Sequence, residues 1–153
     1  MVTKKIFIKI LIVLFVLAVG LHFGMSEALA GASLKTDPAS VEMNPKAMAT
    51  MKIIGAGFGA EDRIEIVLVK ANKGQDVPVA SGDADKDGNF TTRMNILSIL
   101  QGFFNFRFKG GKPLPDPKNP PCPPGRYTMK ATSWDSDAEA TYELEITPPP
   151  KKK

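Results

Sequence analysis

The sequence predicts an all-β protein, an antiparallel β-sandwich of about seven short strands. Apolar and polar residues alternate with a period of two in several stretches between Lys35 and Thr147, which places every second side chain on the same face of a strand. Turn-forming glycine, proline and aspartate separate these stretches. Helical spacing does not persist beyond about two turns, and this disfavours an α/β fold.

The expected strands follow one another in a simple order. They are Ser40–Met43, Met48–Ile54, Arg63–Lys70, Val77–Ala80, Phe90–Met94, a strand whose inward face carries Tyr127, Met129 and Ala131, and a last strand whose inward face carries Tyr142, Leu144 and Ile146. The first is a short edge strand, because it follows the turn-forming pair Asp37–Pro38. The glycine-rich segment Gly55–Phe58 ends the second strand. The third has the clearest alternation, with Ile64, Ile66 and Leu68 on one face.

Residues 1–30 have the organisation of an export signal. Two lysines precede an unbroken apolar run, Ile10–Gly20, and Ala28-Leu29-Ala30 supplies the small residues that signal peptidase requires, with cleavage expected after Ala30. The alternative is an anchor that stays attached, although the apolar segment is shorter than the roughly 20 residues that span a bilayer. We therefore expect an exported protein, in the periplasm, on the cell surface or outside the cell, whose only membrane contact would be an uncleaved N-terminus. Residues 31–147 would form the domain and 148–153 a proline- and lysine-rich tail.

Histidine content and charge exclude several classes of function. The single histidine, His22, lies in the N-terminal block, so the exported part has no histidine for general-base catalysis or most zinc sites. Apart from the three terminal lysines, 14 basic residues face 15 acidic ones beyond residue 30, and such a near-neutral body is not a nucleic-acid-binding surface. A glycosidase that uses only carboxylates would need a cleft that a domain of this size rarely forms. We expect no enzyme, no cofactor and no nucleic-acid partner.

Three short motifs resemble those of bacterial immunoglobulin-like sandwich domains, including the IPT type, of exported proteins. They are GAGF at Gly55–Phe58, DADKDGNF at Asp83–Phe90 and PPGRYTMKAT at Pro123–Thr132. The resemblance covers residues 34–147 and implies an immunoglobulin-like fold. It also implies that Gly55 and Gly57 adopt backbone conformations closed to other residues, and that Tyr127 pins a corner after the Pro124–Gly125 turn. Such domains serve as adhesion modules, surface-layer pieces and spacers, so the resemblance narrows the function little.

Residues 95–124 depart from that pattern as a long insertion. Its first residues have helical spacing for one or two turns. Phe104, Phe106 and Phe108 then alternate with polar residues, and we expect them to form the inward face of an additional strand. The alternative is an exposed aromatic platform for a partner or a glycan, to which Trp134 would also belong. Pro113–Pro124 holds seven prolines and is expected to be extended polyproline or irregular. We expect this segment to be dispensable for folding and needed for partner binding.

Partner contacts are expected at one tryptophan and in the proline-rich segment. The candidates are Trp134, Pro113, Pro115, Pro117, Pro120, Pro121 and Cys122. Trp134 has the outward parity of its strand, and the alternative is that it packs under the proline-rich loop. Cys122 has no second cysteine to pair with, so it is either a loop thiol without a role or an intermolecular disulfide, haem or metal contact.

The acidic turns offer one weak metal site. Asp83, Asp85 and Asp87 followed by glycine match the opening of a calcium loop. The twelfth position is Met94 where a bidentate glutamate belongs, which excludes an EF-hand and favours a plain β-turn. The pairs Glu61–Asp62 and Asp135/Asp137 are expected to be solvated turn residues.

The leading functional expectation is a non-enzymatic exported binding or structural module of the bacterial cell envelope, in contact with a protein or a cell-surface polymer. The alternative is an accessory subunit of a larger secreted or membrane-attached complex that docks through the insertion at residues 95–124.

Overall fold

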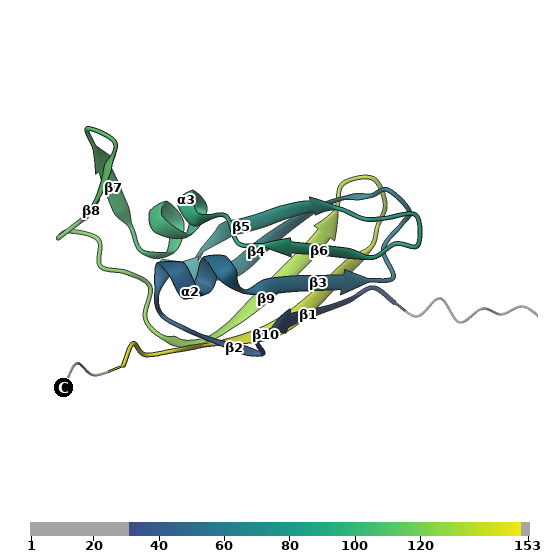
Figure 1. The fold of residues 1–153 in the computed structure, drawn as a ribbon, viewed down its shortest axis with the longest axis horizontal. Coiled ribbons are helices and arrows are strands. Elements are labelled where there is room, and N and C mark those ends of the chain that lie inside the picture. Colours follow the sequence, from purple (N-terminus) through teal and green to yellow (C-terminus); the bar gives the residue numbers. More distant parts are fainter. Residues whose placement is uncertain (1–30, 151–153) are drawn as a thin grey trace, which may run out of the picture. The chain divides into compact units, whose positions relative to one another are not determined.

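A computed structural model of the chain describes residues 31–150, and these consist mainly of β-strands (Figure 1). The expected export signal at residues 1–30 and the three lysines of the expected tail lie outside the described residues. No helix within residues 31–150 has the length and apolar character needed to cross a membrane.

The strands form two larger sheets and one separate hairpin. The first sheet has the order β1 (Ser33–Asp37), β3 (Lys52–Ala56), β6 (Phe90–Arg93); the second has the order β2 (Ser40–Glu42), β10 (Glu139–Thr147), β9 (Gly125–Ser133), β4 (Arg63–Asn72), β5 (Gln75–Asp83); the hairpin pairs β7 (Phe106–Lys109) with β8 (Lys112–Pro115). The two larger sheets contribute side chains to one shared apolar core. An all-β sandwich is therefore the architecture of residues 31–150, with more strands than the sequence led us to expect.

One strand pair departs from the expected antiparallel arrangement. All paired strands are antiparallel except β2 and β10, which are parallel, with Val41 opposite Ile146. The expectation of a wholly antiparallel sandwich is wrong at this edge. The reason is that alternation predicts which side chains face the core, but not whether two neighbouring strands run parallel or antiparallel.

The period-two pattern correctly located the core faces of the long strands. Ile64, Ile66 and Leu68 on β4 are at most 2% exposed, and Leu144 and Ile146 on β10 are at most 1% exposed. Each such side chain contributes about 1.5–3 kcal/mol by leaving water. This burial fixes the register of β4 and β10, because a slip by one residue would turn every one of these side chains outward.

The second expected strand is wrong over its first half. Residues Pro45–Thr50 form the short helix α2, and only Lys52–Ala56 are strand β3. Asn44 starts the helix, since its side-chain oxygen accepts hydrogen bonds from the backbone N–H groups of Lys46 and Ala47 at 2.9 and 3.2 Å, and proline at the first helical position is preorganised for a helical start. The capping pair Asn44-Pro45 outweighs the strand propensity of the residues that follow.

The two glycines of the GAGF motif have different roles. Gly57 has a φ of +79°, as expected. Gly55 is required for a different reason, because a Cβ atom there would lie 2.2 Å from the Phe90 ring. The ring of Phe90 packs over the Gly55 backbone and meets Phe58 edge to face, with 5.3 Å between ring centroids. The expectation of an unusual backbone conformation is thus met at Gly57 and replaced at Gly55 by close aromatic packing.

The expected inward-facing phenylalanine strand is also wrong. After the short helix α3 (Ile96–Ser98), residues Ile99–Phe103 form a π-helical turn, η1, and the turn ends at Asn105, which has a φ of +54°. This turn buries Phe103 and Phe104, leaves Phe106 half-buried and leaves Phe108 exposed. The π-turn adds a residue to the helical repeat and Asn105 reverses the chain, so the alternation that starts at Phe104 does not belong to one strand.

Candidate functional site

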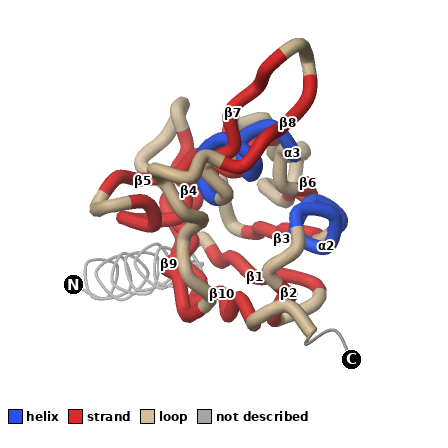
Figure 2. Tube along the Cα trace, turned by 90° about the vertical axis from the view of Figure 1, so that its left-hand side faces the viewer, coloured by secondary structure: helices blue, strands red, loops and turns tan. Residues whose placement is uncertain are grey.

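The insertion forms a β-hairpin that projects beyond the two sheets (Figures 1 and 2). Phe106 lies opposite Pro115 and Phe108 opposite Pro113, so these four side chains share one face of the hairpin. Arg107 lies opposite Leu114, and the two lysines beside the Gly110–Gly111 turn lie opposite each other on that second face. The segment expected to be polyproline or irregular is therefore in part a β-strand, with its prolines at a free edge where no N–H is needed.

Asp116 ties the base of the hairpin together. Its buried carboxylate accepts hydrogen bonds from Arg107 Nε at 2.7 Å, from Asn119 Nδ2 at 3.0 Å and from the backbone N–H of Lys118 at 3.1 Å. The Asn119 amide, followed by the Lys118 N–H and the Arg107 guanidinium, lowers the pKa of Asp116 although partial burial opposes this shift. A two-stranded hairpin alone is marginal in water, so this carboxylate is a principal reason why the hairpin is ordered.

Acid is expected to weaken the hairpin base, because Asp116 holds it together in its ionised form. Because the folded-state pKa of Asp116 lies below its unfolded value of 3.8, its stabilisation is complete above that value and is lost as the pH falls through the folded pKa. Urea unfolding between about pH 5 and pH 2 should show a shallower acid slope for Asp116→Asn than for the parent chain. Asp137→Asn, at an exposed turn, controls for the loss of one carboxylate. Identical slopes for Asp116→Asn and the parent would contradict the assignment.

Cys122 is not at the surface. It is 3% exposed, and its backbone N–H donates to the carbonyl of Phe103 at 2.8 Å. Burial raises the pKa of the thiol, which keeps it protonated and unreactive. The interpretation of Cys122 as an exposed partner, metal or disulfide contact is therefore contradicted. Cys122 is thus one side chain of the proline-rich segment that belongs to the apolar core. That this segment is dispensable for folding stays a prediction.

The insertion carries most of the large exposed hydrophobic side chains, and its net charge is opposite in sign to that of the rest of residues 31–150. Four of the five large exposed hydrophobic side chains in the described chain belong to it: Ile96, Leu97, Phe108 and Leu114. Residues 95–124 hold four basic residues and one acidic residue, a net charge of +3. The rest of residues 31–150 holds ten basic and fourteen acidic residues, a net charge of −4. We call residues 95–124 the insertion surface; it is cationic and apolar, whereas the sandwich is anionic.

The candidate residues chosen from the sequence do not form one site. The candidate prolines Pro113, Pro115, Pro117, Pro120 and Pro121 are all exposed on the insertion surface. Trp134 is 68% exposed and follows the far end of β9, whereas the insertion precedes its start. The nine residues of β9 separate Trp134 from the proline-rich end of the insertion by about 30 Å along the strand. The alternative that Trp134 packs under the proline-rich loop is therefore wrong.

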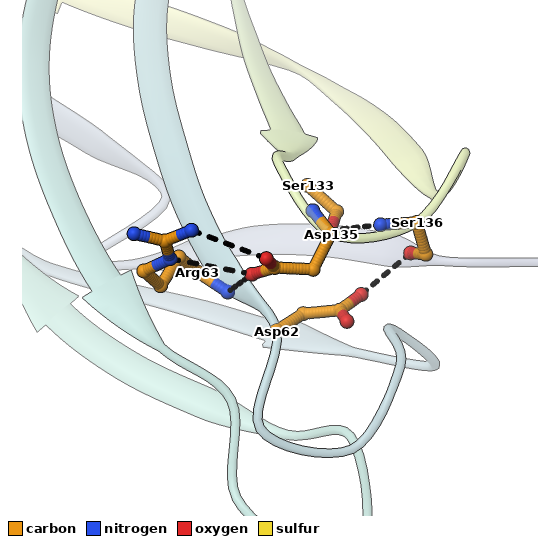
Figure 3. A network of polar contacts seen from close by, with 5 residues as sticks. All are labelled: Asp62, Arg63, Ser133, Asp135 and Ser136. Carbon is orange, nitrogen blue, oxygen red and sulfur yellow. Dashed lines mark hydrogen bonds and ion pairs between the residues drawn. The ribbon is translucent and has the colours of Figure 1, made fainter.

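A polar network holds the loop that carries Trp134 (Figure 3). Ser133 Oγ accepts from the backbone N–H groups of Asp135 and Ser136, both at 3.0 Å. The carboxylate of Asp135 accepts from the backbone N–H of Arg63 at 2.8 Å and pairs with the Arg63 guanidinium at 3.2 Å. The backbone N–H of Trp134 donates to the Arg63 carbonyl at 2.9 Å. Trp134 and Asp135 are thus both attached to Arg63, the first residue of β4.

Asp62 joins the same network and is not the solvated turn residue that we expected. It is 6% exposed, and its carboxylate accepts from Ser136 Oγ at 2.5 Å and from the Gly59 N–H at 2.9 Å. The Ser136 hydroxyl is the main cause of the lowered pKa of Asp62. Sequence reasoning missed this network because its partners lie 74 positions apart. The only local signal was Ser133 itself, since a serine at a strand end often caps the next two N–H groups.

An open groove of about 450 Å³ lies over β4 and β5 beside this loop. Arg63, Asp83 and Trp134 line it at one end, and Asn95 and Ser98 line it at the other. The backbone N–H of Asn95 donates to the carbonyl of Val79, four residues before Asp83 along β5, so the groove is about 13 Å long.

The acidic turn at Asp83–Gly88 is organised by its own backbone. Asp85 Oδ1 accepts from the N–H groups of Asp87 and Asn89, both at 2.9 Å, as in an Asx turn. Among residues 31–150, no three histidine, cysteine, aspartate or glutamate side chains gather in a way that could hold a metal ion. That Asp83, Asp85 and Asp87 form a plain turn and not a calcium site stays a prediction from the sequence.

No protein-family model, no curated protein and no solved structure matches the chain.

Proposed function

We propose that this chain is a non-enzymatic, exported binding module of the bacterial cell envelope that contacts its partner through the insertion surface. The sandwich serves as the scaffold, and the hairpin presents the contact residues. A rigid scaffold with a long, ordered loop is a common arrangement for recognition. Export is proposed from the apolar N-terminal segment and the small residues at Ala28 and Ala30.

We also propose that the sandwich is immunoglobulin-like. The supporting observation is at Tyr127, whose hydroxyl donates to the backbone carbonyl of Pro123, four residues upstream. This resembles the tyrosine corner of such sandwiches, in which the hydroxyl bonds to the backbone a few residues earlier. The two other motifs of that resemblance, GAGF and DADKDGNF, lie close together. The ring of Phe90 packs over Gly55, and the turn that begins at Asp83 is hydrogen-bonded to the GAGF segment.

The observation that carries the binding function is the exposed apolar surface of the hairpin. Phe108 is 38% and Leu114 45% exposed, on opposite faces of the hairpin. Apolar groups exposed on both faces gain free energy when a partner encloses the tip. Lys109 and Lys112 flank the turn, so an acidic or otherwise anionic partner is favoured by charge complementarity.

The test is site-specific photo-crosslinking of the full chain in cells that produce it. A photo-reactive residue at position 108 should give adducts, and one at Thr141, exposed on β10, should not. The double variant Phe108→Ser/Leu114→Ser should lose partner binding, and higher salt should weaken binding by the parent because salt screens exposed charges. Equal adducts at both positions, or none at position 108, would overturn the proposal.

The same experiment distinguishes the alternative, an accessory subunit that docks through the insertion. A single adduct of defined mass and one-to-one stoichiometry would favour a partner subunit of a larger complex. Adducts of heterogeneous mass that resist protease would instead favour a cell-surface polymer.

A further inference from the structure

We propose that the groove over β4 and β5, ending at Trp134, is a second binding site, for an uncharged polysaccharide chain. Asn95 and Ser98, at the start of the insertion, line one end of this groove, but none of the hairpin residues 106–115 does, so the groove can be tested separately from the proposed partner contact. The inference rests on three features of the groove: an ordered and exposed indole, a row of polar side chains and an acidic balance that disfavours anionic ligands.

The aromatic wall is Trp134, the most exposed large hydrophobic side chain among the described residues. An indole that is 68% exposed forgoes much of the burial that makes tryptophan a core residue. Its backbone nevertheless does not move freely, because its own N–H and both following N–H groups are hydrogen-bonded to Arg63 and Ser133. A contact residue that is already ordered loses little entropy on binding, and the flat apolar face of an indole suits the apolar face of a sugar ring.

Polar side chains follow the indole along the groove. Glu65 and Asp83 supply carboxylate acceptors and Ser98 a hydroxyl at the far end, whereas Asn95 supplies the amide NH₂ as a donor, because its oxygen already accepts from the backbone N–H groups of Leu97 and Ser98. Sugar hydroxyls donate and accept hydrogen bonds, so they can satisfy both kinds of group. The groove is open to solvent along about 13 Å, which admits several linked sugar rings in a row.

The charges argue against an anionic ligand. The one cationic side chain in the lining, Arg63, is already paired with Asp135 at 3.2 Å. Glu65 and Asp83 therefore leave an acidic balance that would repel phosphate or carboxylate groups. A cationic peptide is the competing ligand, because its charges could pair with Glu65 and Asp83, and oligolysine distinguishes it in the test below. A neutral polyhydroxyl chain avoids the repulsion that an anion would meet, uses the carboxylates as acceptors for its hydroxyl groups and, unlike a lysine side chain, offers a ring face to the indole.

Trp134 is the only tryptophan in the chain, so its fluorescence reports directly on this groove. We expect the chain, purified after export, to show a saturable blue shift of emission with cellotetraose or chitotetraose, both uncharged. Oligogalacturonate, an anionic sugar chain, and oligolysine, a cationic peptide, are the comparison probes and should have no such effect. Calorimetry should then show about tenfold weaker sugar binding for Trp134→Ala, a loss of about 1.4 kcal/mol, and a smaller loss for Glu65→Gln.

Leu114→Ser on the hairpin is the matched control and should bind sugar as the parent does. Because Trp134 is exposed, Trp134→Ala should keep the parent melting temperature, which separates lost binding from lost folding. No saturable change with either neutral sugar would overturn the proposal. So would equal sugar affinity of Trp134→Ala and the parent, or a response to oligolysine alone, which would assign the groove to a cationic peptide. Failure of crosslinking at position 108 would leave these results unaffected.

Discussion

Replacing Phe103 with alanine should lower the free energy of unfolding by about 3–5 kcal/mol, a large part of the total stability of a small domain. Phe103 is fully buried and stands at the end of the π-turn. Its ring meets the rings of Phe104 and Tyr127 edge to face, with centroids 5.5 and 5.4 Å away. Truncation would leave a cavity between the insertion and β9, since neither ring can follow without leaving its own neighbours.

The matched control is Phe108→Ala, which removes the same atoms from an exposed position. Phe108 is 38% exposed on the hairpin, so its loss should change stability by less than about 0.5 kcal/mol. Both variants can be measured by urea unfolding monitored by circular dichroism. If Phe108→Ala proved as destabilising as Phe103→Ala, the hairpin would have to pack against the sandwich instead of projecting from it.

Gly88→Ala should be comparably severe, with a loss of about 3–5 kcal/mol from two independent causes. Gly88 has a φ of +75°, which L-residues rarely adopt, and a Cβ atom there would lie 2.1 Å from the carbonyl oxygen of Phe58. The two segments are joined at this point, because the Phe58 N–H donates to the Gly88 carbonyl at 3.1 Å. The clash is with backbone, so the turn and the GAGF segment would have to separate.

Gly74→Ala separates the two causes. Gly74 has a φ of +80°, but a Cβ atom there would meet nothing within 4 Å. The substitution should therefore cost only the conformational term, about 1 kcal/mol. Thermal and urea unfolding of the two variants give the comparison. Equal losses would mean that the contact with Phe58 does not constrain the turn.

The period-two pattern was sufficient wherever one strand runs unbroken beside the core. Ile64, Ile66 and Leu68 have the burial expected from alternation alone, because the side chains of an extended chain must point alternately to its two faces. The turn residues were equally informative. The Tyr127 hydroxyl donates to the backbone carbonyl of Pro123, just before the turn that Pro124 and Gly125 mark in the sequence, and the Asp85 turn is organised by local hydrogen bonds.

The same pattern failed where local backbone geometry changed within a few residues. Alternation from Phe104 to Phe108 predicted one strand, but the π-turn and the left-handed Asn105 place these side chains in different environments. Asn105 keeps that conformation through tertiary contacts, since its amide contacts the Asn72 side chain and the Pro120 carbonyl at 2.7 and 2.8 Å. Partners 33 and 15 positions away cannot be found by periodicity.

For the two candidate surfaces, too, some features follow from local patterns in the sequence and others only from packing. The sequence by itself determined that residues 31–147 consist mainly of β-strands and that residues 95–124 stand apart from the sandwich pattern. Only the tertiary structure decided that Trp134 points outward, that Asp62, Arg63, Ser133 and Asp135 form one network and that Cys122 is buried. The physical reason is range: alternation and turn chemistry act between near neighbours in the chain, whereas grooves, charge separation and buried polar networks arise when distant segments pack together.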